Sequence, residues 1–133
     1  MTMRAVHIST VHRSDDTRIF LKECRSLARA GYDVHYLVRR PRAMSADGVT
    51  LHAIYEPERR SAPGRNHLAR VWRLVARGAS AYRRARGLGA DVYHIHDPEL
   101  IPVGLLLRLG GARVVYDVHE DAVAETLTLA GAV

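Results

Sequence analysis

The chain has one cysteine, one tryptophan and one phenylalanine among its 133 residues. The lone Cys24 excludes an internal disulfide. No stretch approaches the roughly 20 apolar residues of a membrane span, and the first residues lack the apolar core of a secretion signal. We therefore expect a protein of the reducing cytoplasm, at most peripheral at the inner face of the plasma membrane.

Glycine is absent from the loop after the first predicted strand. Residues 9–17 read STVHRSDDT, whereas a dinucleotide site needs Gly-x-Gly-x-x-Gly there and a P-loop needs Gly-x-x-x-x-Gly-Lys-Ser/Thr. The sequence of this loop therefore makes both a dinucleotide site and a P-loop unlikely at this position. A phospho-accepting receiver domain is disfavoured as well, because the third predicted strand ends without an aspartate and the fifth without a lysine.

Lysine is nearly absent too. Lys22 is the only one among 20 basic residues, against 14 acidic ones, and the formal charge is +6. This preference for arginine fits a GC-rich coding sequence. Net charge bears on association rather than on fold, and it admits nucleic acid, anionic lipid or phosphorylated ligands. Of these partners we expect no nucleic acid.

Apolar runs alternate with helical patterns along the chain. Strands are predicted at 5–9, 34–38, 49–54, 91–96 and 113–117. Helices are predicted at 67–86, at 99–109, and from a cap at Asp15, Asp16 or Thr17 to Gly31. Strands that are apolar throughout are typical of a parallel sheet covered on both faces. The fold class is therefore α/β, with a Rossmann-like, mostly parallel open sheet of about five strands.

Two segments qualify this simple pattern. The link at 39–48 is too short for a crossover helix, so it departs from a strand-helix-strand repeat. Residues 118–133 begin a helical pattern but stop without a further strand. We therefore expect residues 1–133 to form a single domain whose end is cut and not natural.

Three of the strands are followed by imidazoles and carboxylates. In an open α/β sheet, ligands bind outside the carboxyl ends of the strands. The groups expected at this edge are His12, Asp15 and Asp16 after the first strand, His96, Asp97 and Glu99 after the fourth, and Asp117, His119, Glu120 and Asp121 after the fifth. The sequence thus predicts that ligands bind at one edge of the sheet, where the strands end.

Two histidines of the fourth strand raise the question of a metal. His94 and His96 share a face of the strand and, with Asp97, suggest a metal site. We favour a hydrogen-bonded core role for His94 and expect no bound metal. For His96, at the strand end, a core role and exposure to a ligand are equally open. Asp97 precedes Pro98 and is expected to cap the next helix, a place that also suits an anion or a sugar hydroxyl.

Three segments together carry a family resemblance. They read DDTRIFLKECRSLARAGYDVHYL at 15–37, ADVYHIHDPELIPVGLLL at 90–107 and VVYDVHED at 114–121. In this order and spacing they resemble the N-terminal domain of retaining GT-B glycosyltransferases that use nucleotide-sugar donors. The resemblance implies two Rossmann-like domains across a cleft, the N-terminal one holding mainly the acceptor. The donor-side Glu-x7-Glu motif has no counterpart here, so this hexosyltransferase-like half should be inactive alone.

The resemblance also implies residue roles. His119 matches the family histidine near the transferred sugar and is the expected catalytic residue, as a hydrogen-bonding group to sugar or phosphate. The expected substrate-binding residues are Asp16, Arg18, His96, Asp97 and Glu120. The corresponding first loop is often glycine-rich in the family, whereas this chain has Asp15 and Asp16 there. Arg18 and the start of the helix can still bind an anion. The alternative is that Asp16 only caps the helix. No cofactor is expected in this domain itself.

The helix predicted at 67–86 carries an apolar stripe and, off that stripe, four arginines. The stripe comprises Leu68, Val71, Trp72, Val75, Ala79 and Tyr82, and the arginines are Arg70, Arg73, Arg77 and Arg84. We expect the stripe to pack on the sheet below a solvated basic face. The alternative is a basic amphipathic helix that rests on an anionic bilayer, in keeping with the lipid-linked acceptors of many family members.

A second function class stays open beside the transferase. The domain would then be a stand-alone module that binds carbohydrate, nucleotide or lipid head groups, or a non-catalytic subunit that needs a partner. An isolated half would leave its cleft face and a sheet edge uncovered, and we expect it to self-associate through them.

Overall fold

Apart from one short additional strand and one 3-10 turn, the strands and helices follow one another along the chain in the predicted order. The computed structural model describes residues 2–10, 22–39, 41, 45–55 and 67–117. The elements are β1 (Arg4–Ile8), α1 (Arg25–Arg29), β2 (Asp33–Val38), β3 (Ser45–Ala46), β4 (Val49–Ala53), α2 (His67–Leu88), β5 (Val92–Ile95), the 3-10 turn η2 (Pro98–Leu100), α3 (Ile101–Leu109) and β6 (Arg113–Tyr116). The predicted caps of the first helix at 15–17 lie outside the described residues.

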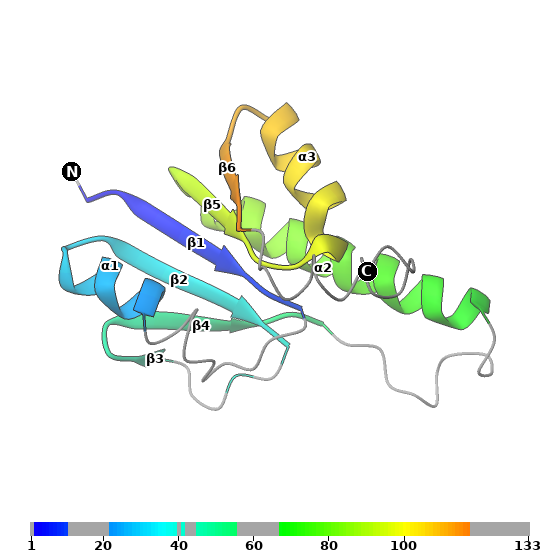
Figure 1. Cartoon of the computed structure of the whole chain (residues 1–133), viewed down its shortest axis with the longest axis horizontal. Coiled ribbons are helices and arrows are strands. Elements are labelled where there is room, and N and C mark those ends of the chain that lie inside the picture. The colour runs from blue at the N-terminus through cyan, green and yellow to red at the C-terminus, as the bar shows by residue number, and fades with distance from the viewer. Residues whose placement is uncertain (1, 11–21, 40, 42–44, 56–66, 118–133) are drawn as a thin grey trace, which may run out of the picture.

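The strands form one sheet in the order β3-β4-β2-β1-β5-β6 (Figure 1). All neighbours pair in parallel except β3, which pairs antiparallel with β4. The α/β, mostly parallel fold class is therefore confirmed, with six strands in place of about five. β1 lies at the centre, next to β2 and β5. The strands up to β4 are added on one side of β1, and β5 and β6 are added on the other side.

The additional strand β3 explains the short link between β2 and β4. Asp47 and Gly48 both have positive φ, 53° and 80°, and join β3 to β4 as a two-residue hairpin. A turn of this type requires positive φ at both positions, which is why Asp-Gly is favoured there. The link needs no crossover helix, because β3 folds back along β4 at the sheet edge.

Each face of the sheet carries its own apolar cluster. Side chains alternate along a strand, so Val34 and Tyr36 face α1 while Leu37 faces α2 and α3. The cluster under α1 comprises Cys24, Val34, Tyr36, Val38, Val49 and Leu51. The cluster under α2 and α3 includes Val6, Ile8, Leu37, Tyr93, Ile95, Leu100 and Val103. Helices thus cover both faces, as the apolar strands predict.

The apolar stripe of α2 does not pack as predicted. The buried residues of α2 are the small Ala69, Ala81 and Ala85, which let the helix lie close to its neighbours. The larger residues at its start are exposed, with Leu68 at 72%, Trp72 at 53% and Val75 at 57%. Figure 1 shows the first turns of α2 extending past the strands, so these residues have no sheet beneath them.

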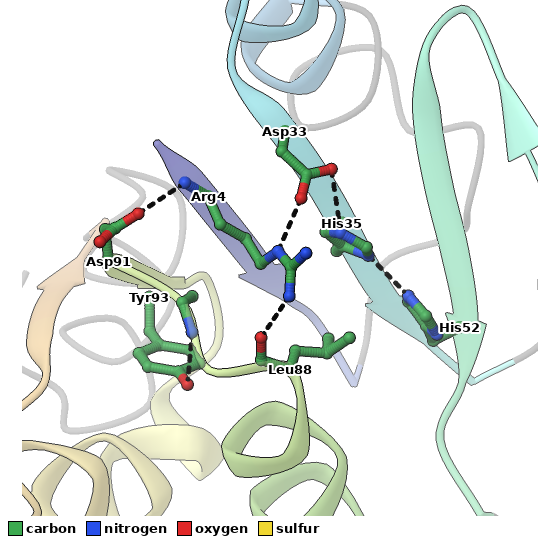
Figure 2. Close-up of polar contacts among 8 residues, drawn as sticks. Arg4, Asp33, His35, His52, Leu88, Asp91 and Tyr93 are labelled. Atoms are coloured by element: carbon green, nitrogen blue, oxygen red, sulfur yellow. Dashed lines mark hydrogen bonds and ion pairs between the residues drawn. The ribbon is translucent and has the colours of Figure 1, made fainter. Parts of the chain in front are cut away.

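Arg4 joins three elements at the amino end of the sheet (Figure 2). Its guanidinium donates to Asp33 at the start of β2 and to the Leu88 carbonyl at the end of α2, both over 2.6 Å. Its backbone N–H donates to Asp91, just before β5, over 2.7 Å. These contacts fix the amino ends of the parallel strands, and the opposite, carboxyl ends carry the candidate site.

Candidate functional site

The carboxyl ends of β1, β5 and β6 lie side by side, as predicted. Ile8 pairs with Ile95, and Ile95 pairs with Tyr116. The residues that follow them are polar: Ser9 and Thr10 after β1, His96 and Asp97 after β5, and Asp117 after β6. Parallel pairing thus brings groups from three distant parts of the sequence to one edge.

A buried polar network links the ends of β1 and β5. Asp97 accepts hydrogen bonds from the Ser9 hydroxyl over 2.9 Å and from the Thr10 backbone N–H over 2.7 Å. All three residues are at most 2% exposed. A buried carboxylate is costly unless it is hydrogen-bonded in this way, so Asp97 fixes how the chain leaves β1.

The network continues toward α2. The Thr10 hydroxyl donates to the Glu99 carboxylate, and Glu99 lies 3.8 Å from the Arg77 guanidinium. Arg77 is thus directed at the site by an ion pair with η2. Sequence reasoning placed Arg77 on a solvated face, because the approach of η2 to α2 is a tertiary feature.

The predicted capping role of Asp97 is only half right. Asp97 holds the position before η2, with Pro98 at its first residue, but its side chain makes no capping hydrogen bond. The carboxylate instead accepts from the end of β1. A 3-10 turn, and not the predicted α-helix, follows Asp97, and α3 begins at Ile101.

Four side chains converge on the α1 side of the sheet, next to this network. They are His7 on β1, Glu23 before α1, His94 on β5 and His96 after it, and one ligating atom of each lies within 4.8 Å of the others. His96 is 1% exposed. Of its two predicted roles, a core residue or an exposed ligand-binding residue, the structure therefore supports the core role. Burial, with His94 nearby, lowers the pKa of His7 to about 3, so the ring is neutral at pH 7.

Sequence reasoning missed His7 and Glu23. The signal for His7 was present, because a parallel sheet with β1 next to β5 pairs His7 with His94 and directs both to one face. Glu23 carried no such signal, since its approach depends on how α1 packs. Among the described residues, this is the one group whose atoms converge closely enough to hold a metal ion.

Several of the predicted site residues lie outside the described residues. They are Asp16, Arg18, His119 and Glu120, together with His12, Asp15 and Asp121. Of the predicted site, the structure therefore places His96, Asp97, Glu99 and Asp117. His96 and Asp117 face each other, with 3.8 Å between Nδ1 and Oδ2.

Comparison with known proteins decides the family. Residues 17–133 match the family model described as the glycosyl transferase 4-like domain. The chain belongs to this family. The predicted resemblance to glycosyltransferases is thereby confirmed at the level of the family, which covers most of the chain. No match was found among curated proteins.

Two solved structures show that the fold of this glycosyl transferase 4-like domain occurs in other glycosyltransferases. The structure titled as the glycotransferase of kitacinnamycin matches with a TM-score of 0.60 at 15% identity over 97% of this chain. The calicheamicin glycosyltransferase CalG4 matches with a TM-score of 0.62 at 16% identity over 98% of this chain. The chain spans 34% and 38% of their lengths.

The basic residues of the glycosyl transferase 4-like domain fall into two groups. Arg70, Arg73 and Arg77 surround Leu74 and line a hollow of about 230 Å³. Arg84 lies nearer the end of α2, where its charge contributes to lowering the pKa of His52. By helical spacing the four arginines share one side of α2, with Arg84 about two turns beyond Arg77. None of the helices in the described ranges has the length and hydropathy needed to cross a membrane.

Proposed function

We propose that this chain is the acceptor-binding, N-terminal part of a retaining glycosyltransferase that takes its sugar from a nucleotide-sugar donor. The observation that carries the proposal is the carboxyl edge of the sheet, where the ends of β1, β5 and β6 bring hydroxyl, imidazole and carboxylate groups together. Ligands of open α/β sheets bind at this edge, and such groups donate to and accept from sugar hydroxyls.

The residues have two kinds of role in this proposal. His96 and Asp97 are buried and form the floor of the acceptor site, where Asp97 positions Ser9 and Thr10. Asp16, Arg18 and Glu120 contact the substrate. His119 is the catalytic residue, because it follows the β6 end by three positions and an imidazole N–H can stabilise charge on the sugar or the departing phosphate.

The donor and its nucleotide belong to a second domain in this proposal. The domain described here binds no cofactor and is inactive alone, because an acceptor site without a donor has nothing to transfer. The neighbours support this division only through size, since the chain spans about a third of each. The isolated chain is therefore expected to bind an acceptor without consuming a nucleotide sugar.

The test uses the full-length protein with a panel of nucleoside-diphosphate sugars. His119→Ala should reduce kcat by about 100-fold or more, the usual cost of losing one group that stabilises transition-state charge. The control is His67→Ala, an exposed histidine at the start of α2, which should leave kcat unchanged. Proton NMR of the product should show the donor's anomeric configuration. Equal activity of the two variants, or an inverted product, would contradict the proposal.

A stand-alone binding module is the competing function, and the same protein separates the two. If no sugar is transferred in full-length protein with any donor, while the isolated chain binds carbohydrate in a calorimeter, the module reading is favoured. Light scattering of the isolated chain at high concentration tests the expected self-association.

The start of α2 favours an acceptor at a membrane surface. Leu68, Trp72 and Val75 are more than half exposed and share one face of α2 by helical spacing, whereas Arg70 and Arg73 lie on the other side of the same helix. A helix with one apolar and one basic face suits an anionic bilayer, which attracts the charges and accepts the apolar side chains. We therefore propose that α2 holds the enzyme at an anionic membrane.

Vesicle sedimentation tests this attachment. The chain should sediment with vesicles of phosphatidylglycerol and phosphatidylcholine at low salt and lose this binding as salt rises. Exchange of both Arg70 and Arg73 for Glu should abolish sedimentation, whereas Arg113→Glu, an exposed arginine on β6, should change it little. Absence of binding at low salt would overturn the attachment and leave the transferase proposal intact.

A further inference from the structure

The four side chains on the α1 side of the sheet have the spacing of a metal site. Glu23 Oε2 lies 3.5 Å from His96 Nε2, 3.7 Å from His7 Nδ1 and 3.8 Å from His94 Nδ1. His7 Nδ1 and His96 Nε2 are 3.0 Å apart. One oxygen and three nitrogens therefore lie within 4.8 Å of one another.

Hydrogen bonding alone does not account for this spacing. Good hydrogen bonds between nitrogen and oxygen are about 2.7–3.2 Å long, and the Glu23 oxygen is farther than this from all three rings. A tetrahedral zinc ion with bonds of about 2.0–2.2 Å holds its ligand atoms roughly 3.3–3.6 Å apart. The distances of 3.0–3.8 Å lie around that value, and all four ligand atoms lie within 4.8 Å of one another, so a small ion would fit once the side chains close in on it.

The donor types agree with the spacing. Imidazole nitrogen suits zinc and its neighbours in the first transition series, whereas magnesium and calcium prefer oxygen. The carboxylate of Glu23 would offset half of the charge of a divalent ion. His7 and His96 are almost fully buried, at 1% exposure each, so their rings have little freedom to leave the site.

The neighbouring groups also fit a metal-bound histidine. His96 offers Nε2 to the cluster, and its other nitrogen, Nδ1, lies 3.8 Å from the Asp117 carboxylate. Carboxylates commonly stand behind ligating histidines, where they orient the ring and fix its tautomer. Cys24 does not belong to the set, because it packs in the apolar cluster under α1.

We propose that His7, Glu23, His94 and His96 bind one divalent transition-metal ion, with zinc as the best fit. This site goes beyond the transferase function and does not depend on it. All four positions of a tetrahedron are filled by the protein, which is typical of structural sites. The ion would fasten β1 and β5 to the start of α1, directly below the Ser9 to Asp97 network.

The test uses the whole chain without any histidine tag, stripped with a chelator and then titrated with zinc chloride in a calorimeter. We expect one equivalent to bind. Cobalt(II) should give the intense visible bands of a tetrahedral complex. At a zinc concentration roughly 100 times Kd, the Tm should rise on the order of 10 °C, because only the folded state holds the site.

Two variants probe the ligands, and a third is the control. Glu23→Gln keeps the shape of the side chain, and His94→Ala removes a half-buried ring; each should weaken zinc binding by more than the roughly 10–100-fold cost of losing an outer partner. His52→Ala removes a ring from the other histidine pair, 2.8 Å from His35 on the opposite face, and should leave binding unchanged. Circular dichroism checks that each variant folds.

The outcomes separate a metal site from a metal-free histidine cluster. One equivalent of zinc that is lost in Glu23→Gln and His94→Ala but kept in His52→Ala supports the site. No binding at micromolar zinc overturns it and leaves a network in which His7 and His96 share a proton. Equal loss in all three variants, or octahedral cobalt spectra, would also overturn it.

Discussion

The Ser9 hydroxyl donates a hydrogen bond of 2.9 Å to Asp97 across the carboxyl ends of β1 and β5. The two residues are 88 positions apart in the sequence, and both are buried. The contact joins the two strands at the edge where the acceptor is proposed to bind. Its strength therefore bears on both stability and function.

Replacing Asp97 tests this junction. Asp97→Asn can place an amide N–H where two donors now point, so we expect a loss of about 1–3 kcal/mol in the free energy of unfolding, as for other buried groups left unsatisfied. Ser9→Ala removes only one donor and should cost about 1 kcal/mol. Urea unfolding followed by circular dichroism measures both. A variant at Asp97 as stable as the wild type would show that the network contributes nothing.

A tyrosine hydroxyl stabilises the amino end of the sheet. Tyr93 donates to the Ala85 carbonyl over 2.8 Å and accepts from the Ala90 backbone N–H over 3.1 Å; Figure 2 shows Tyr93 near the end of α2. Tyr93→Phe keeps the packing and removes both bonds, so the free energy of unfolding should fall by about 1–2 kcal/mol. Thermal unfolding provides the measurement, and an unchanged Tm would contradict it.

Two helical glycines should respond in opposite ways to alanine. A Cβ at Gly104 would lie 2.9 Å from Ile95 Cδ1 and 3.3 Å from Val114 Cγ1, and Ile95 is buried. Overpacking costs about 1–3 kcal/mol and outweighs the helix-propensity gain of about 1 kcal/mol, so Gly104→Ala should lower the free energy of unfolding by about 1 kcal/mol. A Cβ at Gly87 in α2 meets nothing within 4 Å, so Gly87→Ala should gain about 0.5–1 kcal/mol from helix propensity. Chemical denaturation of the pair settles the sign of each.

His52, which pairs with His35 on the sheet, should make stability depend on pH. Burial, with His35 and Arg84 nearby, lowers the pKa of His52 below its usual 6.5, and Asp33 lies 3.1 Å from His35 on the other side. A histidine whose folded pKa is depressed stabilises the fold fully above the unfolded pKa, and this contribution is lost as the pH falls below about 6.5. His52→Gln should therefore show a smaller loss of Tm between pH 7.5 and 5. An identical slope in both proteins would refute the coupling.

Much of the fold followed from local pattern. Apolar runs such as Val34 to Val38 predict buried parallel strands, and Gly31, with a φ of 95°, ends its helix as expected. The strand β3 was missed, although Asp47-Gly48 is a strong hairpin signal, because a two-residue strand has no measurable period. The prediction that the apolar stripe of α2 packs on the sheet was wrong for the first turns of the helix. Helical periodicity shows which residues share a face, but it does not show whether a sheet lies beneath that face.

The sequence by itself determined the order of the elements, the parallel sheet and the edge at which polar groups gather, because each depends on short-range periodicity and on the residues that end strands. Only the tertiary structure decided which of those groups meet. The register of β1 against β5 placed His7 beside His94, and the packing of α1 added Glu23. The pairing of β1 with β5 also brought Asp97 to Ser9, so its carboxylate accepts from the end of β1 and does not cap the turn that follows it. Such choices arise from long-range contacts, whose energies depend on residues distant in the sequence and leave no local signal.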